Sequence, residues 1–102
     1  MTTQKRELLC LNTAQKSFYK KAIIIETIGE LGERQKLELK SYNTIVASIS
    51  FMDNVQIDIF GKYSRTTWRH IREFILQNVP VKYWNTICYD FGNGVKRWFY
   101  NA

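Results

Sequence analysis

The chain has 102 residues, which is room for one domain (residues 1–102), and 45% apolar with 15% aromatic residues is enough for one modest core. Its net charge of +6 is uneven, because residues 1–60 hold eight basic and seven acidic side chains while residues 61–102 hold seven and two. This balance excludes mimicry of DNA by a surface of carboxylates and favours an anionic partner.

Cysteine content and hydropathy argue against a disulfide-rich, metal-binding or membrane-spanning protein. Cys10 and Cys88 are too few and too far apart for a disulfide framework, and no Cys-x-x-Cys pair indicates a metal or redox site. No apolar run approaches the ~20 residues that a membrane span needs. We therefore expect a soluble, cytoplasmic protein with no cofactor, no metal and no membrane partner.

Four short strands are predicted before residue 61. The first lies within 18–28, where Ile23, Ile24 and Ile25 form a β-branched run that favours a strand. Gly29 then begins a glycine-containing segment that favours a hairpin turn. Three further segments alternate apolar and polar residues with a period of two, and these are 37–40, 44–51 and 55–59.

The short turn at Asp53 and Asn54 joins the last two of these strands and predicts antiparallel pairing. The sheet is therefore expected to be a meander. We expect an α+β fold, in which a four- or five-stranded, mostly antiparallel sheet carries one helix on one face.

That helix is expected at 65–78. Ser64 can accept a hydrogen bond from the first turn, and Tyr63 can pack on Trp68 as a hydrophobic staple. Asn78 ends the helix, because Pro80 disfavours helical backbone in the residue before it and donates no amide hydrogen bond.

The two sides of this helix differ in character. Large apolar side chains share one arc and should dock on the sheet, namely Trp68, Ile71, Phe74 and Ile75. Arg65, Arg69 and Arg72 share the opposite arc. Arg69 can pair with Glu73, but such a pair contributes only a few tenths of a kcal/mol. Two interpretations stay open: an anion-binding surface, or a charged face that serves solubility. Leu76 lies on the arginine arc, so unless the C-terminal tail covers it, an exposed leucine amid positive charge would mark a protein-binding patch.

The C-terminal tail repeats aromatic and basic residues around a turn at 92–94, which suggests a final hairpin or an added edge strand. Aromatic rings beside cations are typical of grooves for single-stranded nucleic acid. The alternative is that Trp84, Trp98 and Tyr100 complete the core from an edge strand. The candidate partner-binding residues are Arg65, Arg69, Arg72, Leu76, Lys96, Arg97 and Trp98.

Catalysis is not expected. His70 is the only histidine, and its helical neighbours Thr66 and Gln77 supply no nucleophile or carboxylate, so we expect a surface or flanking position for it. The acids show no spacing typical of a general acid and base pair. We therefore predict neither catalytic residues nor metal ligands.

Three motifs carry a resemblance that spans roughly residues 11–77. They are Asn-Thr-Ala-Gln-Lys-Ser-Phe-Tyr at 12–19, Ser-Tyr-Asn-Thr at 41–44 and Tyr-Ser-x-Thr-Thr-x-x-His-Ile at 63–71. Together they resemble a family of short, uncharacterised proteins encoded by phages and mobile elements of Gram-positive bacteria. The tail beyond Pro80 looks peculiar to this chain.

The resemblance implies a phage protein acting in the host cytoplasm, and it assigns no reaction. Our first hypothesis is an inhibitor of a host-defence effector, such as an anti-CRISPR protein that binds a Cas nuclease–guide complex. The second is a basic accessory protein that binds DNA or RNA. A third, structural hypothesis is a homo-oligomer joined through the aromatic C-terminal edge.

Overall fold

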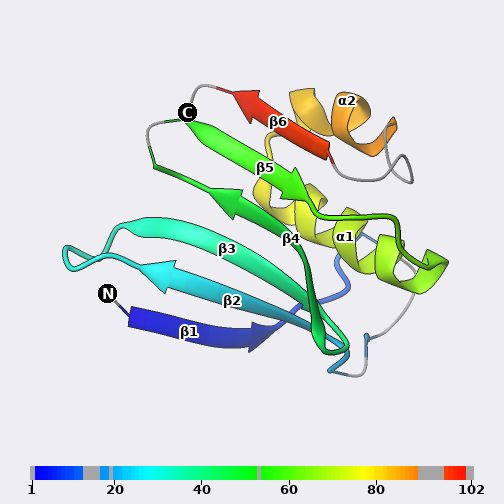
Figure 1. Cartoon of the computed structure of the whole chain (residues 1–102), viewed down its shortest axis with the longest axis horizontal. Helices are drawn as coiled ribbons and strands as arrows, with labels where there is room; N and C mark the ends of the chain where they lie inside the picture. The colour runs from blue at the N-terminus through cyan, green and yellow to red at the C-terminus, as the bar shows by residue number, and fades with distance from the viewer. Residues whose placement is uncertain (1, 13–16, 19, 53, 90–95, 101–102) are drawn as a thin grey trace.

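Six strands form one antiparallel sheet within the part of the chain that the computed structural model describes, which is all but residues 1, 13–16, 19, 53, 90–95 and 101–102 (Figure 1). Their order in the sheet is their order in the chain. The strands are β1 (Thr2–Glu7), β2 (Ala22–Ile28), β3 (Arg34–Ser41), β4 (Thr44–Ser50), β5 (Val55–Ile59) and β6 (Lys96–Tyr100). The α+β meander expected from the alternating segments is confirmed.

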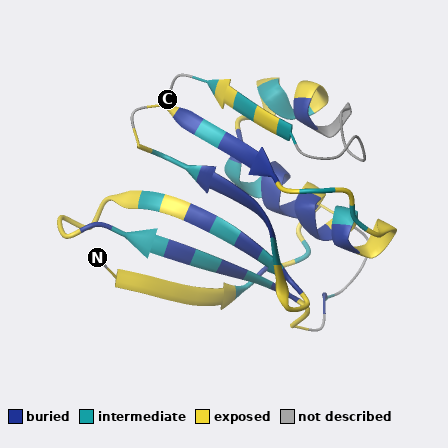
Figure 2. Cartoon of the chain, in the orientation of Figure 1, coloured by how far each residue is buried: buried dark blue, intermediate teal, exposed yellow. Residues whose placement is uncertain are grey.

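One face of the sheet builds the core. A cross-strand row of Ile24, Leu39, Ala47 and Ile59 is set by the pairing register and is buried. Figure 2 shows buried and half-buried positions alternating along β2 and β3. The alternate residues face the other way and are mostly half-buried or exposed, as a sheet covered on one side requires.

Helix α1 (Arg65–Asn78) lies across the core face of the sheet (Figure 1). Its start is as predicted, because Ser64 Oγ accepts from the Thr67 amide at 3.3 Å and the Tyr63 and Trp68 rings meet at 6.0 Å. The side chains of Ile71, Phe74 and Ile75 are entirely buried against the sheet, so the predicted docking face is confirmed.

A short 3-10 turn, η1 (Val81–Tyr83), and a second helix, α2 (Trp84–Tyr89), follow α1. Neither was expected from the sequence. The Trp84 indole donates to the Val79 carbonyl at 2.6 Å and folds this segment back onto the end of α1. No helix in the described ranges is long and apolar enough to span a membrane.

The two edge strands of the sheet, β1 and β6, differ in how well they could be predicted from the sequence. Strand β1 was not predicted, because its side chains are polar and exposed and carry no apolar alternation. Strand β6 confirms the expected edge strand: Trp98 and Tyr100 pack against the core, and the Tyr100 ring stacks on Tyr83 at 4.4 Å. The turn expected at 92–94 lies outside the described residues, as does Asp53 of the β4–β5 turn.

Candidate binding surface

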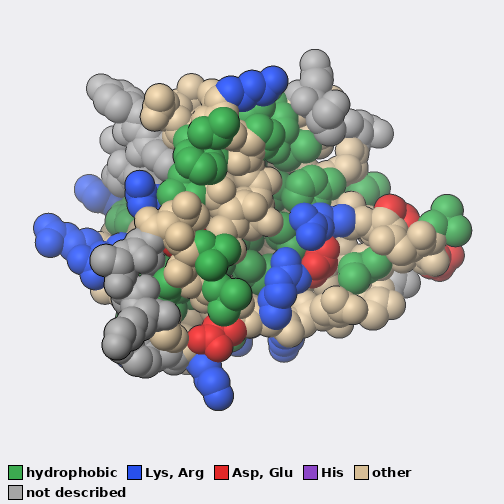
Figure 3. All heavy atoms as spheres, turned by 180° about the vertical axis from the view of Figure 1, so that it is seen from behind, with side chains coloured by type: hydrophobic (Ala, Val, Ile, Leu, Met, Phe, Trp, Pro, Cys, Tyr) green, Lys and Arg blue, Asp and Glu red, His purple; other side chains and the backbone are tan. Residues whose placement is uncertain are grey.

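Three arginines form the exposed side of α1. Arg65, Arg69 and Arg72, called the arginine face below, are all exposed, and none makes an ion pair with another residue that the structure describes. Figure 3 views the molecule from behind Figure 1 and shows Lys and Arg side chains both at the margin of this side and nearer its centre, among hydrophobic side chains. The arginines are thus available to an anionic partner.

The expected pairing of Arg69 with Glu73 is replaced by another arrangement. Glu73 is only 3% exposed, and its carboxylate accepts from the Asn12 amide at 2.8 Å, from Asn12 Nδ2 at 2.7 Å and from Gln77 Nε2 at 2.8 Å. The segment after β1 therefore docks on α1 through neutral donors. Arg69 and Arg72 border a pocket of about 190 Å³ beside this carboxylate.

The other predicted site residues do not gather around the arginine face. Leu76 is 9% exposed and is one of the buried residues of α1, so the exposure that would have made it part of a protein-binding patch is not found. Trp98 is half-buried against the core. Arg97 lies on the opposite face of the sheet, where its Nε donates to Asp58 Oδ1 at 2.6 Å. Lys96 is half-buried at the start of β6.

Exposed apolar residues do occur near α1, in the segment after β1. Leu9 is 59% exposed and Leu11 is 67% exposed, and the Leu9 carbonyl accepts from Gln77 Nε2 at 2.7 Å. Burial, followed by the carboxylates of Glu73 and Glu7, raises the pKa of the Cys10 thiol between these leucines, which disfavours a reactive thiolate. Neither leucine stands out in the sequence, because only contacts with α1 reveal where this segment lies.

His70 is buried, contrary to the expected surface position. It is 1% exposed, its Nδ1 lies 2.8 Å from the Ser41 hydroxyl, and that hydroxyl lies 3.1 Å from Thr67 Oγ1. Burial lowers the pKa of His70, and the charge of Lys21 lowers it further. Because Ser41 is buried as well, this hydrogen-bonded group fixes α1 on β3.

The stretches that carry the sequence resemblance meet around His70, as far as their residues are described; 13–16 and 19 lie outside the described part. The Phe18 ring packs edge-on against His70 with centroids 4.6 Å apart, and the Tyr42 ring lies 5.9 Å away. Tyr42 is itself 5.7 Å from the Lys21 ammonium. These motifs thus hold α1 in position and place Lys21 and Tyr42 near its buried histidine.

Most of the chain, residues 6–90, matches a protein family described as a family of unknown function (DUF8033). The chain belongs to DUF8033. No curated protein and no solved structure matches it. The DUF8033 match includes the arginine face and the residues around His70, and it extends past Pro80, where the resemblance had been expected to stop. Lys96, Arg97 and Trp98 lie beyond it.

Metal ligands are not clustered in the described part of the chain, where no group of three His, Cys, Asp or Glu side chains could hold an ion. Every buried side-chain nitrogen and oxygen described there has a hydrogen-bond partner.

Proposed function

We propose that this protein is a small phage-encoded inhibitor of a host-defence complex, of the anti-CRISPR type, that acts by binding and without catalysis. The arginine face of α1 is the contact surface in this proposal. The observation that carries it is the combination of three exposed arginines, free of ion pairs to described residues, with two exposed leucines, Leu9 and Leu11, in a segment whose Leu9 carbonyl accepts a hydrogen bond from Gln77 of the same helix.

The charge of the arginine face favours an anionic partner. Guanidinium groups bind carboxylates or phosphates through two parallel hydrogen bonds and stay charged at any working pH. The helix that carries the three arginines is held by the His70 and Glu73 contacts, so its backbone is in place before binding. A partner then has only side-chain conformational entropy to remove from this surface.

The leucines favour a protein over bare nucleic acid. Leu9 and Leu11 are large apolar side chains in the segment whose Asn12 bonds to Glu73, and Glu73 shares a pocket with Arg69 and Arg72. Interface centres are enriched in apolar residues and arginine, whereas the phosphate backbone is contacted chiefly by charge. An acidic protein surface on the effector complex accounts for both features.

Capture of purified defence effectors tests the proposal. The intact chain is immobilised, and Cas nuclease–guide complexes are passed over it at physiological salt, with their DNA cleavage measured in parallel. We expect retention of at least one complex together with loss of its cleavage. A chain that retains no effector and leaves every cleavage rate unchanged would contradict the proposal.

A second candidate function is a basic accessory protein that binds DNA or RNA. The net charge of +6 and the absence of acidic partners for the arginine face among the described residues favour it. Each arginine bound to a phosphate releases counterions, so replacement of all three by alanine should reduce the slope of log affinity against log salt by about three units. An unchanged slope would contradict this function.

A further inference from the structure

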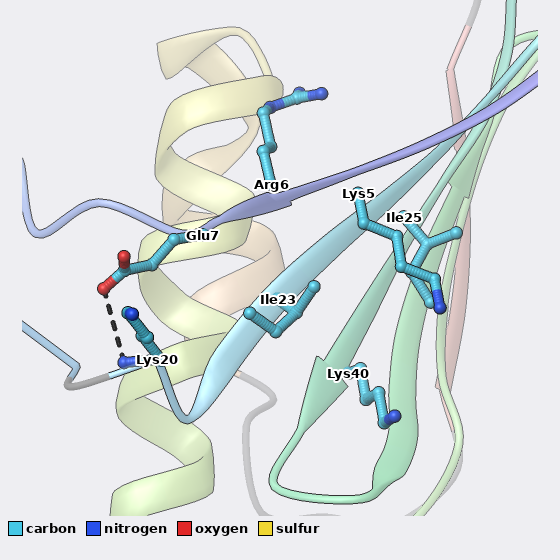
Figure 4. A pocket seen from close by; sticks show the side chains of 7 residues that line it. All are labelled: Lys5, Arg6, Glu7, Lys20, Ile23, Ile25 and Lys40. Carbon is cyan, nitrogen blue, oxygen red and sulfur yellow. Dashed lines mark hydrogen bonds between the residues drawn. The ribbon is translucent and has the colours of Figure 1, made fainter.

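A second pocket, distinct from the arginine face, lies on the face of the sheet opposite α1. We propose that it binds a nucleotide, meaning a flat ring that carries a phosphate. The pocket measures about 370 Å³ and lies where β1, β2 and β3 run side by side (Figure 4). We call it the lysine pocket, after Lys5, Lys20 and Lys40 at its border.

The floor of the lysine pocket is apolar. Ile23 and Ile25 of β2 supply it, and both are only half-buried. The register places Lys5 beside Ile25 and Lys40 beside Ile23, so each isoleucine has a lysine on a neighbouring strand. Figure 4 shows these side chains on the same side of the strands, whereas Arg6 points away from them.

The charge of the pocket is positive. Lys5, Lys20 and Lys40 form no ion pair with any described residue, while Arg6 is already paired with Glu26 at 2.7 Å. Glu7 is the one carboxylate that lines the pocket. Three ammonium groups against one carboxylate suit a group with nearly two negative charges, which is the charge of a phosphate monoester near neutral pH.

A second acid near the pocket, Glu38, is already paired with a lysine. Glu38 lies beside Ile25 in the register, but its carboxylate pairs with Lys36 at 3.8 Å. It therefore adds little negative charge to the pocket.

Lys20 is held at the border of the pocket by its backbone. Its φ of 63° is in the left-handed region, which costs a residue other than glycine about 1 kcal/mol or more. The Glu7 carboxylate accepts from the Lys20 amide at 3.3 Å and stabilises this conformation, as the dashed line in Figure 4 marks. Glu7 thereby acts as a positioning residue for a lysine.

The shape of the pocket selects the rest of the ligand. Its volume lies in the range of about 300 to 1,000 Å³ typical of small-molecule sites. The pocket is open on the sheet surface, so a flat base can lie across the two isoleucines. A free mononucleotide and the terminal nucleotide of a single strand share this chemistry.

Titration of the full-length chain with adenosine monophosphate, followed by NMR of the isoleucine methyl groups, tests the proposal. Inorganic phosphate and adenosine are titrated separately, and a short single-stranded DNA with a terminal phosphate forms the fourth arm. We expect saturable shifts at Ile23 and Ile25 with the nucleotide, at concentrations at least ~10-fold below those needed for phosphate or adenosine, because both halves of the site contribute to affinity. If the DNA binds more tightly than adenosine monophosphate at the same methyl groups, the natural ligand is the end of a nucleic-acid strand. If the DNA binds equally or more weakly, the natural ligand is a free nucleotide.

Charge reversal on the pocket border supplies the matched comparison. Lys5→Glu with Lys40→Glu should weaken nucleotide binding by about tenfold or more, whereas Lys62→Glu with Lys82→Glu, two exposed lysines elsewhere, should leave it nearly unchanged. Alanine replacement of the arginine face should also leave it unchanged, which separates this site from the proposed function. Equal losses in both lysine pairs, or nucleotide binding no tighter than that of phosphate, would overturn the proposal.

Discussion

His70 owes its buried position to one hydroxyl far away in the sequence. The hydroxyl of Ser41, at the end of β3, lies 2.8 Å from Nδ1 of the His70 imidazole. The Phe18 ring packs edge-on against the same imidazole. The helix pattern alone could not reveal this, because a single histidine on an amphipathic helix suits a flank as well as an interior with a polar partner. Only the strand register brings Ser41 beneath α1.

The stability of the protein should therefore depend on pH near neutrality. Burial and the charge of Lys21 lower the pKa of His70 in the folded state below its ordinary value of 6.5, so on acidification the unfolded chain binds the proton first. Stability is then complete above pH 6.5 and falls as the pH drops below it towards the folded pKa. Thermal melts between about pH 7.5 and about pH 5.5 should show this slope in the native chain and a much smaller one in His70→Gln. Equal slopes would exclude His70 as its source.

Glu73 should couple energetically to Asn12. Two donors of Asn12 meet this buried carboxylate, and hydrogen bonds to charged groups contribute about 1.5 to 3 kcal/mol. Asn12→Ala removes only the side-chain donor, so we expect a loss of about 2 kcal/mol in the free energy of unfolding. Exposed Asn43→Ala is the control and should change it by less than about 0.5 kcal/mol. In a double-mutant cycle with Glu73→Ala, a coupling energy near zero would contradict this account.

At the scale of elements, the sequence was most informative where a strong apolar period met clear end signals. Helix α1, with Ser64 before it and Pro80 after it, is the best case, and β2 to β5 follow from β-branched runs and alternation. Strand β1 has only polar side chains, nearly all of them exposed, so its pairing with β2 leaves no apolar alternation in the sequence. The segment 81–89 was missed because its helical turns are short.

Strand β6 provides a test at this scale, since its alternate side chains face opposite ways. Trp98 packs on the core, whereas the neighbouring Phe99 is 60% exposed on the other face. Trp98→Ala should lower the free energy of unfolding by about 3 kcal/mol, and Phe99→Ala by less than about 1 kcal/mol. Chemical denaturation of both variants measures the difference. If both variants lose equally little free energy of unfolding, Trp98 does not contribute to the core, and the aromatic residues of the tail are free to stack on a ligand.

For the whole molecule, the sequence predicted the fold class, the docked helix and the arginine face. It could not assemble the two candidate sites, because the exposed leucines, the lysine pocket and the Glu73 contacts are created by register and by segments distant along the chain. Leu76 and Arg97 show the same limit: one is covered, and the other is drawn to Asp58 on the far face of the sheet.

We propose that α1 binds its partner through its arginines and that net positive charge alone does not suffice. The direct measurement is the affinity of three proteins for one purified Cas nuclease–guide complex at physiological salt: the native chain, an Arg65, Arg69 and Arg72 triple alanine variant, and a charge-matched triple alanine variant of exposed Lys36, Lys62 and Lys82. We expect binding to weaken by at least about tenfold in the arginine variant and by less than about threefold in the lysine variant. Equal weakening in both variants would reduce the interaction to net charge and contradict the account.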